Sequence, residues 1–172
     1  MTILYADDSD KVQWPDTDSH DPNSKKYYYI SYRPPYRVSE TPYIKGVDVV
    51  ISSPFNGCMY ECISGGISDI LPPIFETIEG KSTIDNDVKW KCKTYIARLQ
   101  PGDSITDSTW TSDTGVTLDL PIIIDGISTG IRVTSVDPTF KKFTITNHIT
   151  LQRVSGRIEE FDKSLVIPVK EL

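Results

Sequence analysis

The stretch FTITNHITL, residues 143–151, decides the fold class. Its side chains alternate between core-type residues and a threonine or histidine, which is the period of a β-strand with one face in a core and one in water. The residues expected to point inward are Phe143, Ile145, Asn147, Ile149 and Leu151. The same alternation returns near the end of the chain at Leu165, Ile167 and Val169.

The surrounding segment, residues 95–172, consists of short strand-like runs between turn signals. These signals are PGD, SDTG, DGISTG, VDPT and SGR. Turns spaced by roughly 8–12 residues are typical of an antiparallel sandwich or barrel, and no long segment keeps the 3.6-residue period of a helix. We therefore predict an all-β protein whose C-terminal part is a β-sandwich.

A second, smaller antiparallel β module is predicted over residues 36–94. Pro54 and the Asn56–Gly57 pair predict a hairpin, and Pro72–Pro73 predict a loop. In CMYEC (58–62), strand geometry turns Cys58, Tyr60 and Cys62 to one face. This spacing is that of a pleated strand, whereas a redox pair favours Cys-x-x-Cys and a zinc site needs further Cys or His ligands.

Residues 1–35 differ from the rest, because they are rich in Asp, Ser, Pro and Tyr and show no period that would bury a face. We predict an extended N-terminal arm that docks on a partner or a neighbouring subunit. The acidic clusters lack the glycine and glutamate positions of an EF-hand loop, so no metal is predicted. Tyrosine with arginine is typical of interfaces, and the candidate interface residues are Trp14, Tyr27, Tyr28, Tyr29, Tyr32, Arg33, Tyr36 and Arg37. The alternative is that alternate tyrosines pack on the first module.

Composition excludes several classes of function. The net charge of −6 and the absence of a basic run argue against nucleic-acid binding. Neither a leader peptide nor an apolar run long enough to span a bilayer is present, so a soluble protein made in the cytoplasm is expected. Neither His20 nor His148 has a nucleophile and an acid nearby in the sequence that would identify a catalytic triad, and both are expected at the surface. No catalytic residue or cofactor is predicted.

Two ordered sets of motifs resemble proteins of tailed bacteriophages. PGDSITDSTWTSDTGVTL (101–118), FTITNHIT (143–150), SGR (155–157) and the terminal VKEL resemble the fibre–tail adaptor family over residues 95–172. GRIEEFDKSLVIPVKEL departs from that family by two extra residues before the last strand. The middle segment, with Tyr60-Glu61-Cys62 and Trp90-Lys91-Cys92, is similar to a small β module of phage virion and tail proteins.

The resemblance implies a non-enzymatic virion component, located at the tail or neck. Its fold would be an immunoglobulin-like β-sandwich preceded by the small module, and its partners would be other tail or neck proteins, the tail fibre and copies of itself. It also implies that Cys62 and Cys92 share one position in a two-strand core, with or without a disulfide. The expected structural core residues are Cys62, Trp90, Cys92 and Trp110.

Other functions remain open at this point. A capsid decoration or head–tail collar protein would use the same fold. A carbohydrate-binding adhesin could use Trp14, Trp110 or the tyrosines as sugar platforms, and a hydrolase is the least favoured class because no nucleophile elbow or acid pair is present.

Overall fold

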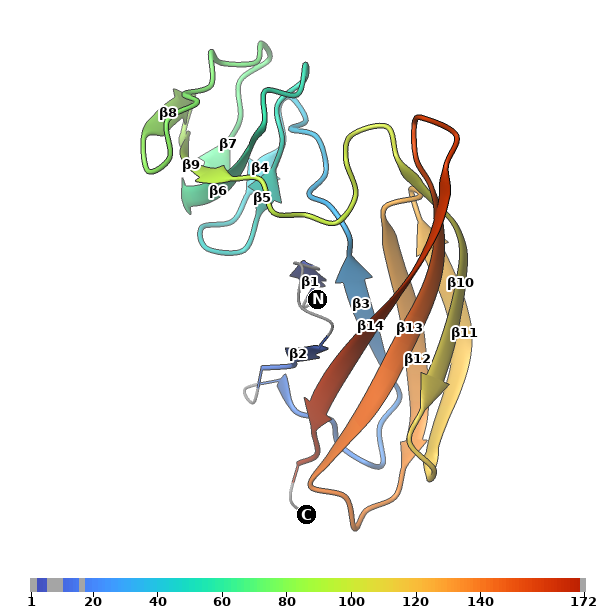
Figure 1. Cartoon of the computed structure of the whole chain (residues 1–172). Coiled ribbons are helices and arrows are strands. Elements are labelled where there is room, and N and C mark those ends of the chain that lie inside the picture. The colour runs from blue at the N-terminus through green and yellow to red at the C-terminus, as the bar shows by residue number, and fades with distance from the viewer. Residues whose placement is uncertain (1–2, 6–10, 16–17, 171–172) are drawn as a thin grey trace. The chain divides into compact units, whose positions relative to one another are not determined.

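The computed structural model describes residues 3–5, 11–15 and 18–170. The described chain is built almost entirely from β-strands, which confirms the predicted all-β fold. It divides into two compact units (Figure 1). The larger unit comprises residues 1–33 and 97–172, and the smaller unit, called the module below, comprises residues 34–96.

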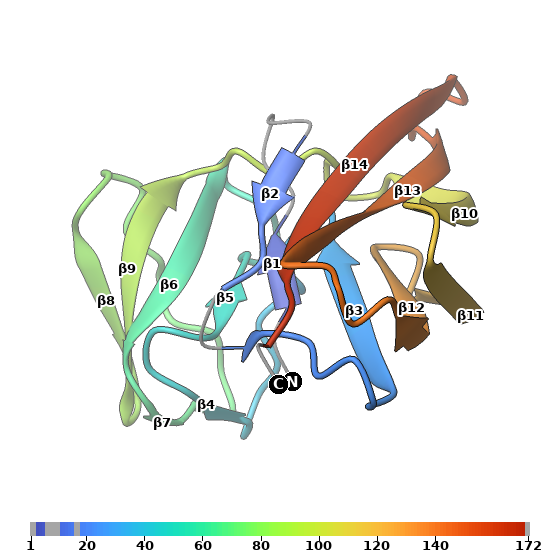
Figure 2. The ribbon, with the colours of Figure 1, turned by 90° about the horizontal axis from the view of Figure 1, so that it is seen from below.

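The larger unit contains two four-stranded sheets. The first has the order β1 (Ile3–Tyr5), β3 (Lys26–Ser31), β12 (Ser128–Val136) and β11 (Val116–Ile124). The second has the order β10 (Ser104–Ser112), β13 (Lys142–Gln152), β14 (Ile158–Pro168) and β2 (Lys11–Gln13). Figure 2 shows β2 beside β14, with which it pairs in parallel.

Both sheets contribute to one hydrophobic core. Tyr28 and Ile30 enter it from β3, and Ile131 and Val133 enter it from β12. The second sheet contributes Phe143, Ile145, Ile149, Leu151, Leu165 and Ile167. The alternation predicted for residues 143–151 is therefore confirmed, including Asn147, which is fully buried.

The structure corrects the prediction of a separate N-terminal docking arm. Residues 26–31 form a strand that lies between β1 and β12, antiparallel to β12. Tyr28 and Ile30 occupy alternate positions of this strand and point into the core, as does Tyr32 directly after it. The strand is hard to recognise from the sequence, because its antiparallel partner β12 begins about a hundred residues later.

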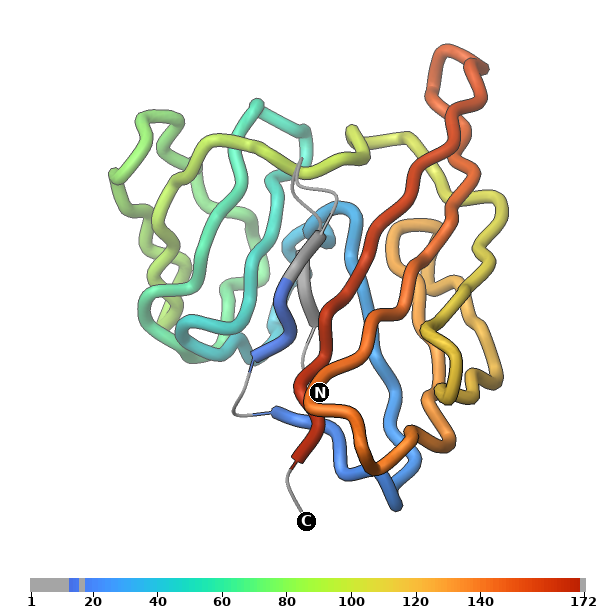
Figure 3. Tube along the Cα trace, turned by 60° about the horizontal axis from the view of Figure 1, so that its bottom comes forward, coloured from blue at the N-terminus to red at the C-terminus, as the bar shows by residue number. Residues whose placement is uncertain are grey.

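The module is consequently inserted within the larger unit, and the chain is not a linear series of arm, module and sandwich. The chain leaves the larger unit after β3 and returns before β10, as Figure 3 traces. The sequence-based boundaries of 36–94 differ from the structural ones by two residues at each end.

The module is built on one four-stranded sheet and a two-stranded one. The larger sheet has the order β5 (Val49–Val50), β6 (Cys58–Ser64), β9 (Val88–Thr94) and β8 (Ser82–Asp85). The smaller sheet pairs β4 (Pro42–Tyr43) with β7 (Gly66–Ile67). The core consists of Tyr43, Val50, Cys58, Tyr60, Cys62, Val88, Trp90 and Cys92, with Phe75 packed against it. β5 and β6 form the predicted hairpin, whereas β8 lies within residues 70–87, which the sequence predicts as a loop around Pro72–Pro73.

A buried polar network crosses the core of the larger unit. The side chains of Tyr32 and Thr129 both donate to Asn147 Oδ1, at 2.8 and 2.7 Å. Asn147 Nδ2 donates to Ser108 Oγ at 2.8 Å and to the carbonyl oxygen of Thr109 at 3.0 Å. The amide of one residue thus satisfies polar groups that come from both sheets.

Replacement of Asn147 by alanine should lower the free energy of unfolding by about 2–4 kcal/mol, because it leaves buried hydroxyl groups unpaired and creates a cavity. Chemical denaturation of the full chain measures this loss. Thr150→Ala, on the outer face of the same strand, is the matched control and should cost less than about 1 kcal/mol. Equal losses in both variants would contradict a special role for the network.

His20 is fully buried, contrary to its predicted place at the surface. Its Nδ1 lies 2.9 Å from Tyr28 Oη, and its ring meets Phe143 edge-on. Among the described residues, no group forms a hydrogen bond with Nε2. Burial, and then the nearby charge of Lys26, lower the pKa of His20 below its ordinary 6.5, while Asp21 acts in the opposite direction.

Acidification should therefore destabilise the larger unit. Because the pKa of His20 is lower in the folded chain than in the unfolded chain, the unfolded chain binds the proton first. The contribution of neutral His20 to the free energy of unfolding should be complete above pH 6.5. It should fall as the pH drops from 6.5 towards the folded-state pKa of His20. Denaturation between pH 5 and pH 8 measures this, and His20→Gln should remove the part of the pH dependence that belongs to His20. The same dependence in His20→Gln as in the native chain would contradict the assignment.

Candidate protein-interaction site

Three of the predicted interface residues lie in the core instead. Trp14, Tyr28 and Tyr32 are at most 1% exposed. The Trp14 ring packs edge-on against Tyr28 with centroids 4.8 Å apart, and its Nε1 donates to Asp18. A fully buried side chain cannot belong to a binding surface, so the prediction is wrong for these three aromatic residues.

Tyr27 and Tyr29 lie on the opposite face of the same strand and are half-buried. Their rings stack with centroids 5.8 Å apart. The Tyr29 ring lies across Gly130, where a Cβ atom would come within 2.7 Å of the ring. The guanidinium of Arg132 is 5.9 Å from the Tyr27 ring centre and pairs with Asp119. These two tyrosines form a small ordered surface on the outside of the first sheet.

The remaining predicted interface residues flank the point where the chain enters the module. Arg33 is half-buried at the end of the first segment of the larger unit. Tyr36 is 37% exposed and forms a bridge with Ile51. Arg37 is the most informative of the three, because it is a charged side chain with only 5% of its surface exposed.

Arg37 is held by a buried carboxylate. Its Nε and Nη2 donate to the two oxygens of Asp85, at 2.9 and 2.7 Å. Trp90 Nε1 donates to Asp85 Oδ2 at 2.9 Å, and the backbone amide of Asp69 donates to Oδ1 at 3.0 Å. Arg37 Nη2 also donates to the carbonyl oxygens of Asp69 and Leu71. This network fixes the loop that begins at residue 69 to the sheet of the module.

The electrostatics of the pair follow from these contacts. Burial by itself would raise the pKa of Asp85, but the hydrogen bonds from Arg37, Trp90 and the amide of Asp69 outweigh it and hold the pKa below its ordinary value. The hydrogen bond with Asp85 is the main reason that the pKa of Arg37 is raised. Both side chains therefore stay charged at neutral pH.

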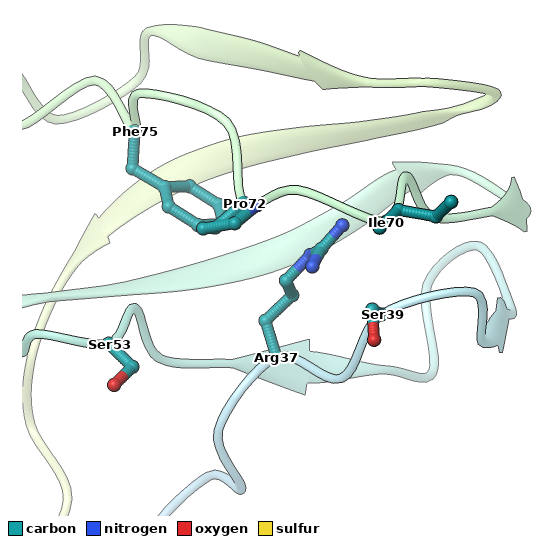
Figure 4. Close-up of a pocket in the computed structure, with 6 residues that line it drawn as sticks. All are labelled: Arg37, Ser39, Ser53, Ile70, Pro72 and Phe75. Atoms are coloured by element: carbon teal, nitrogen blue, oxygen red, sulfur yellow. The ribbon is translucent and has the colours of Figure 1, made fainter.

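A pocket of about 320 Å³ opens beside this network. It is lined by Arg37, Ser39, Ser53, Ile70, Pro72 and Phe75. In Figure 4 the Arg37 guanidinium points towards the segment that carries Ile70 and Pro72. The lining combines apolar side chains with a fixed cation and two hydroxyl groups, which is a mixed composition typical of binding pockets.

Most of the exposed large apolar side chains among the described residues belong to the module. Its loop over residues 69–78, called the Pro-Pro loop below, carries Ile70 at 64%, Leu71 at 73%, Ile74 at 97% and Ile78 at 61% exposure. Ile70 also lines the pocket, and several exposed apolar groups on one short loop mark an interaction surface. The Pro-Pro loop and its pocket are therefore the candidate interaction site, and only Arg37 of its members was predicted from the sequence.

The predicted structural core residues have the expected burial. Cys62, Trp90 and Cys92 are buried in the module, and the half-buried Trp110 packs against the core of the larger unit. The predicted pairing of Cys62 with Cys92 is wrong in register, because Cys62 lies opposite Trp90 and Cys92 lies opposite Tyr60.

The three cysteines are free thiols. Burial, with a hydrogen bond that involves Cys58, raises the pKa of Cys92 to about 11, so this thiol is protonated at neutral pH. Among the described residues, no group of three or more His, Cys, Asp or Glu side chains could hold a metal ion.

A hydrogen-bonded triplet lies on the outer face of the second sheet. Thr111 Oγ1 is 3.0 Å from His148 Nε2, and His148 Nδ1 is 2.6 Å from Asp162 Oδ1. The order hydroxyl, imidazole, carboxylate is that of a catalytic triad. However, His148 and Asp162 are 39% and 67% exposed on an open sheet face, without the dry, preorganised surroundings that stabilise an oxyanion. We therefore assign it no catalytic role.

Comparison with known proteins does not assign the chain to a family. No protein-family model matches the chain, and no curated protein matches it either. None of the described residues forms a helix that is long and apolar enough to cross a membrane.

The carboxylate of Asp85 should be essential for the order of the Pro-Pro loop. Asp85→Ala leaves the buried Arg37 charge without its counter-ion and the Trp90 N–H without its acceptor, and should cost about 3–5 kcal/mol. Hydrogen exchange of the Asp69 and Glu76 amides, two loop amides that are hydrogen-bonded in the native chain, measures the local loss in the full chain. Asp87→Ala, at an exposed position two residues later, is the control. Because the folded-state pKa of Asp85 is lowered, its contribution should be complete above pH 3.8 and be lost at lower pH. Unchanged exchange in Asp85→Ala would contradict this role.

Proposed function

We propose that the protein is a structural component of a tailed-bacteriophage virion that connects fibres to the tail through protein–protein interfaces. The concentration of exposed aliphatic side chains on the inserted module is the observation that carries the proposal. A connector needs one part with a stable core and another that presents contact surface. The resemblance of residues 95–172 to fibre–tail adaptors supports the same role.

The strand order of the larger unit supports an immunoglobulin-like fold. If β1, β3, β10, β11, β12, β13 and β14 are taken as strands A to G, the two sheets have the orders ABED and CFG of that fold. In this assignment β2 is a further strand beside G. One feature departs from the pattern, because β1 runs parallel to β3. The module then occupies the connection between strands B and C.

The adhesin alternative is weakened by the burial of Trp14, which removes one sugar platform. The decoration or collar alternative shares every structural feature described above, and it differs in the number of copies per particle. Hundreds of copies would indicate decoration, and a dozen or fewer sets at one vertex would indicate the neck or tail.

The proposal is tested by locating the protein in purified particles with a tag or antibody, together with a count of its copies. We expect the label at the tail, close to the fibres, with a low copy number at one vertex. A label distributed over the capsid, or particles without the protein, would overturn the proposal.

Ile74→Asp should reduce incorporation into particles by about tenfold or more, because it places a charge in an apolar contact. Ile74 is 97% exposed, so the fold should be unaffected. Ile158→Asp, at a 66% exposed position of the larger unit, is the matched control. Normal incorporation of the Ile74 variant would exclude the Pro-Pro loop as the attachment surface.

A further inference from the structure

The module carries a basic sheet face. Lys89, Lys91 and Lys93 alternate along β9 with buried residues and therefore all point outward. Glu61 is opposite Lys91 on β6, and its carboxylate pairs with Lys93 at 2.8 Å. One acidic group thus faces three lysines, within a chain whose net charge is −6. We call this surface the lysine face.

Apolar groups accompany these lysines. Ile84 is opposite Lys89 on β8 and is 72% exposed, and the half-buried Met59 is opposite Lys93 on β6. Like charges two residues apart on one strand repel each other. A surface that combines uncompensated positive charge with exposed methyl groups fits a partner that is acidic and partly apolar.

The outer face of the second sheet of the larger unit has this chemistry. The strand pairings align three rows of residues across β10, β13 and β14: Asp107–Thr150–Glu160, Thr109–His148–Asp162 and Thr111–Thr146–Ser164. The three acidic side chains are exposed, the threonines provide methyl groups, and no lysine or arginine occurs in these rows on β10, β13 and β14. The one cation that the described pairings add is Lys11 of β2, opposite Ser164 in the row without a carboxylate. We call this surface the acidic face.

The spacing of the charges also matches. Neighbouring lysines on β9 are two residues apart, as are Glu160 and Asp162 on β14. Two residues along a strand span about 6.8 Å. A pair of lysines can therefore meet a pair of carboxylates without a change in the backbone of either sheet.

We propose that the lysine face of one copy of the protein docks on the acidic face of a second copy. This proposal rests on the proposed function, in which the protein works beside copies of itself, and it names the surfaces through which the copies would meet. Since the two faces differ, the contact is heterologous, and every copy offers both halves of it. Such contacts produce rings when the rotation closes and open chains when it does not.

The size of the faces determines the strength of the contact. Three rows on three strands cover roughly 15 Å by 20 Å, or about 300 Å², which is well below the roughly 800 Å² per partner of a standard stable interface. The association should therefore be weak and concentration-dependent. Because its attraction is mainly between exposed charges, it should also be sensitive to salt.

The experiment is sedimentation of the purified full chain over a range of concentrations, at low and high salt. The native protein should associate at low salt, and high salt should raise the apparent Kd by about tenfold or more. Reversal of the lysine face (Lys89→Glu, Lys91→Glu and Lys93→Glu) or of the acidic face (Asp107→Lys, Glu160→Lys and Asp162→Lys) should have a similar effect. Reversal of both faces in one chain should bring the apparent Kd back to within about threefold of the native value. The control reverses three exposed lysines outside both faces, with Lys25→Glu, Lys45→Glu and Lys141→Glu.

The double reversal keeps the test decisive, because a chain that regains association must have both units folded. A native chain that stays monomeric at low salt, single-face reversals that associate normally, or a folded double reversal that remains monomeric would each overturn the proposal. If the protein is nevertheless found at the tail in particles, the proposed function stands and only the pairing of these two faces is wrong.

Discussion

The side-chain amide of Asn147 is the interaction on which the rest of the larger unit depends. It joins Tyr32, the residue that follows β3, to Ser108 and Thr109 of β10. These partners precede and follow the inserted module along the chain. The backbone hydrogen bond from the amide of Leu99 to the carbonyl oxygen of Tyr32 closes the same gap at 3.0 Å. The core of the larger unit thus holds the first and last residues of the inserted module close together. The folding of the module itself therefore does not have to supply the entropy cost of bringing its two ends together.

The sequence predicts the elements that have a regular apolar period, and it fails where the period is carried by tyrosine. Residues 143–151 and the Cys58–Cys62 strand have the predicted faces, because alternation alone determines them. Tyr28 and Tyr32 were expected in an interface, since tyrosine suits both a wet surface and a core. Their burial depends on His20 and Asn147, which accommodate the two hydroxyl groups. Asn147 lies 115 residues after Tyr32, and these two become neighbours only through the strand order.

The same limit applies to the candidate interaction site. Arg37 was recognised as an interface residue by composition, but its carboxylate partner lies 48 residues later, and the partner turns a mobile cation into a fixed wall of a pocket. The apolar groups of the Pro-Pro loop flank two prolines, Pro72 and Pro73, which cannot donate a backbone hydrogen bond and so keep this segment out of a sheet. Thr111, His148 and Asp162 also meet only through the register of three strands. The spacing of these residues along the chain does not predict that they lie in contact.

The insertion between β3 and β10 also affects how the protein would respond to a pulling force. A domain attached in series transmits load through one covalent link, whereas the module is attached through two, at its first and its last residue. Tension on the module is therefore divided between β3, an interior strand of the first sheet, and β10, an edge strand of the second. To separate the two units, both sheets would have to yield. In the proposed role of a connector, this arrangement would share the load on the module between the two sheets of the larger unit.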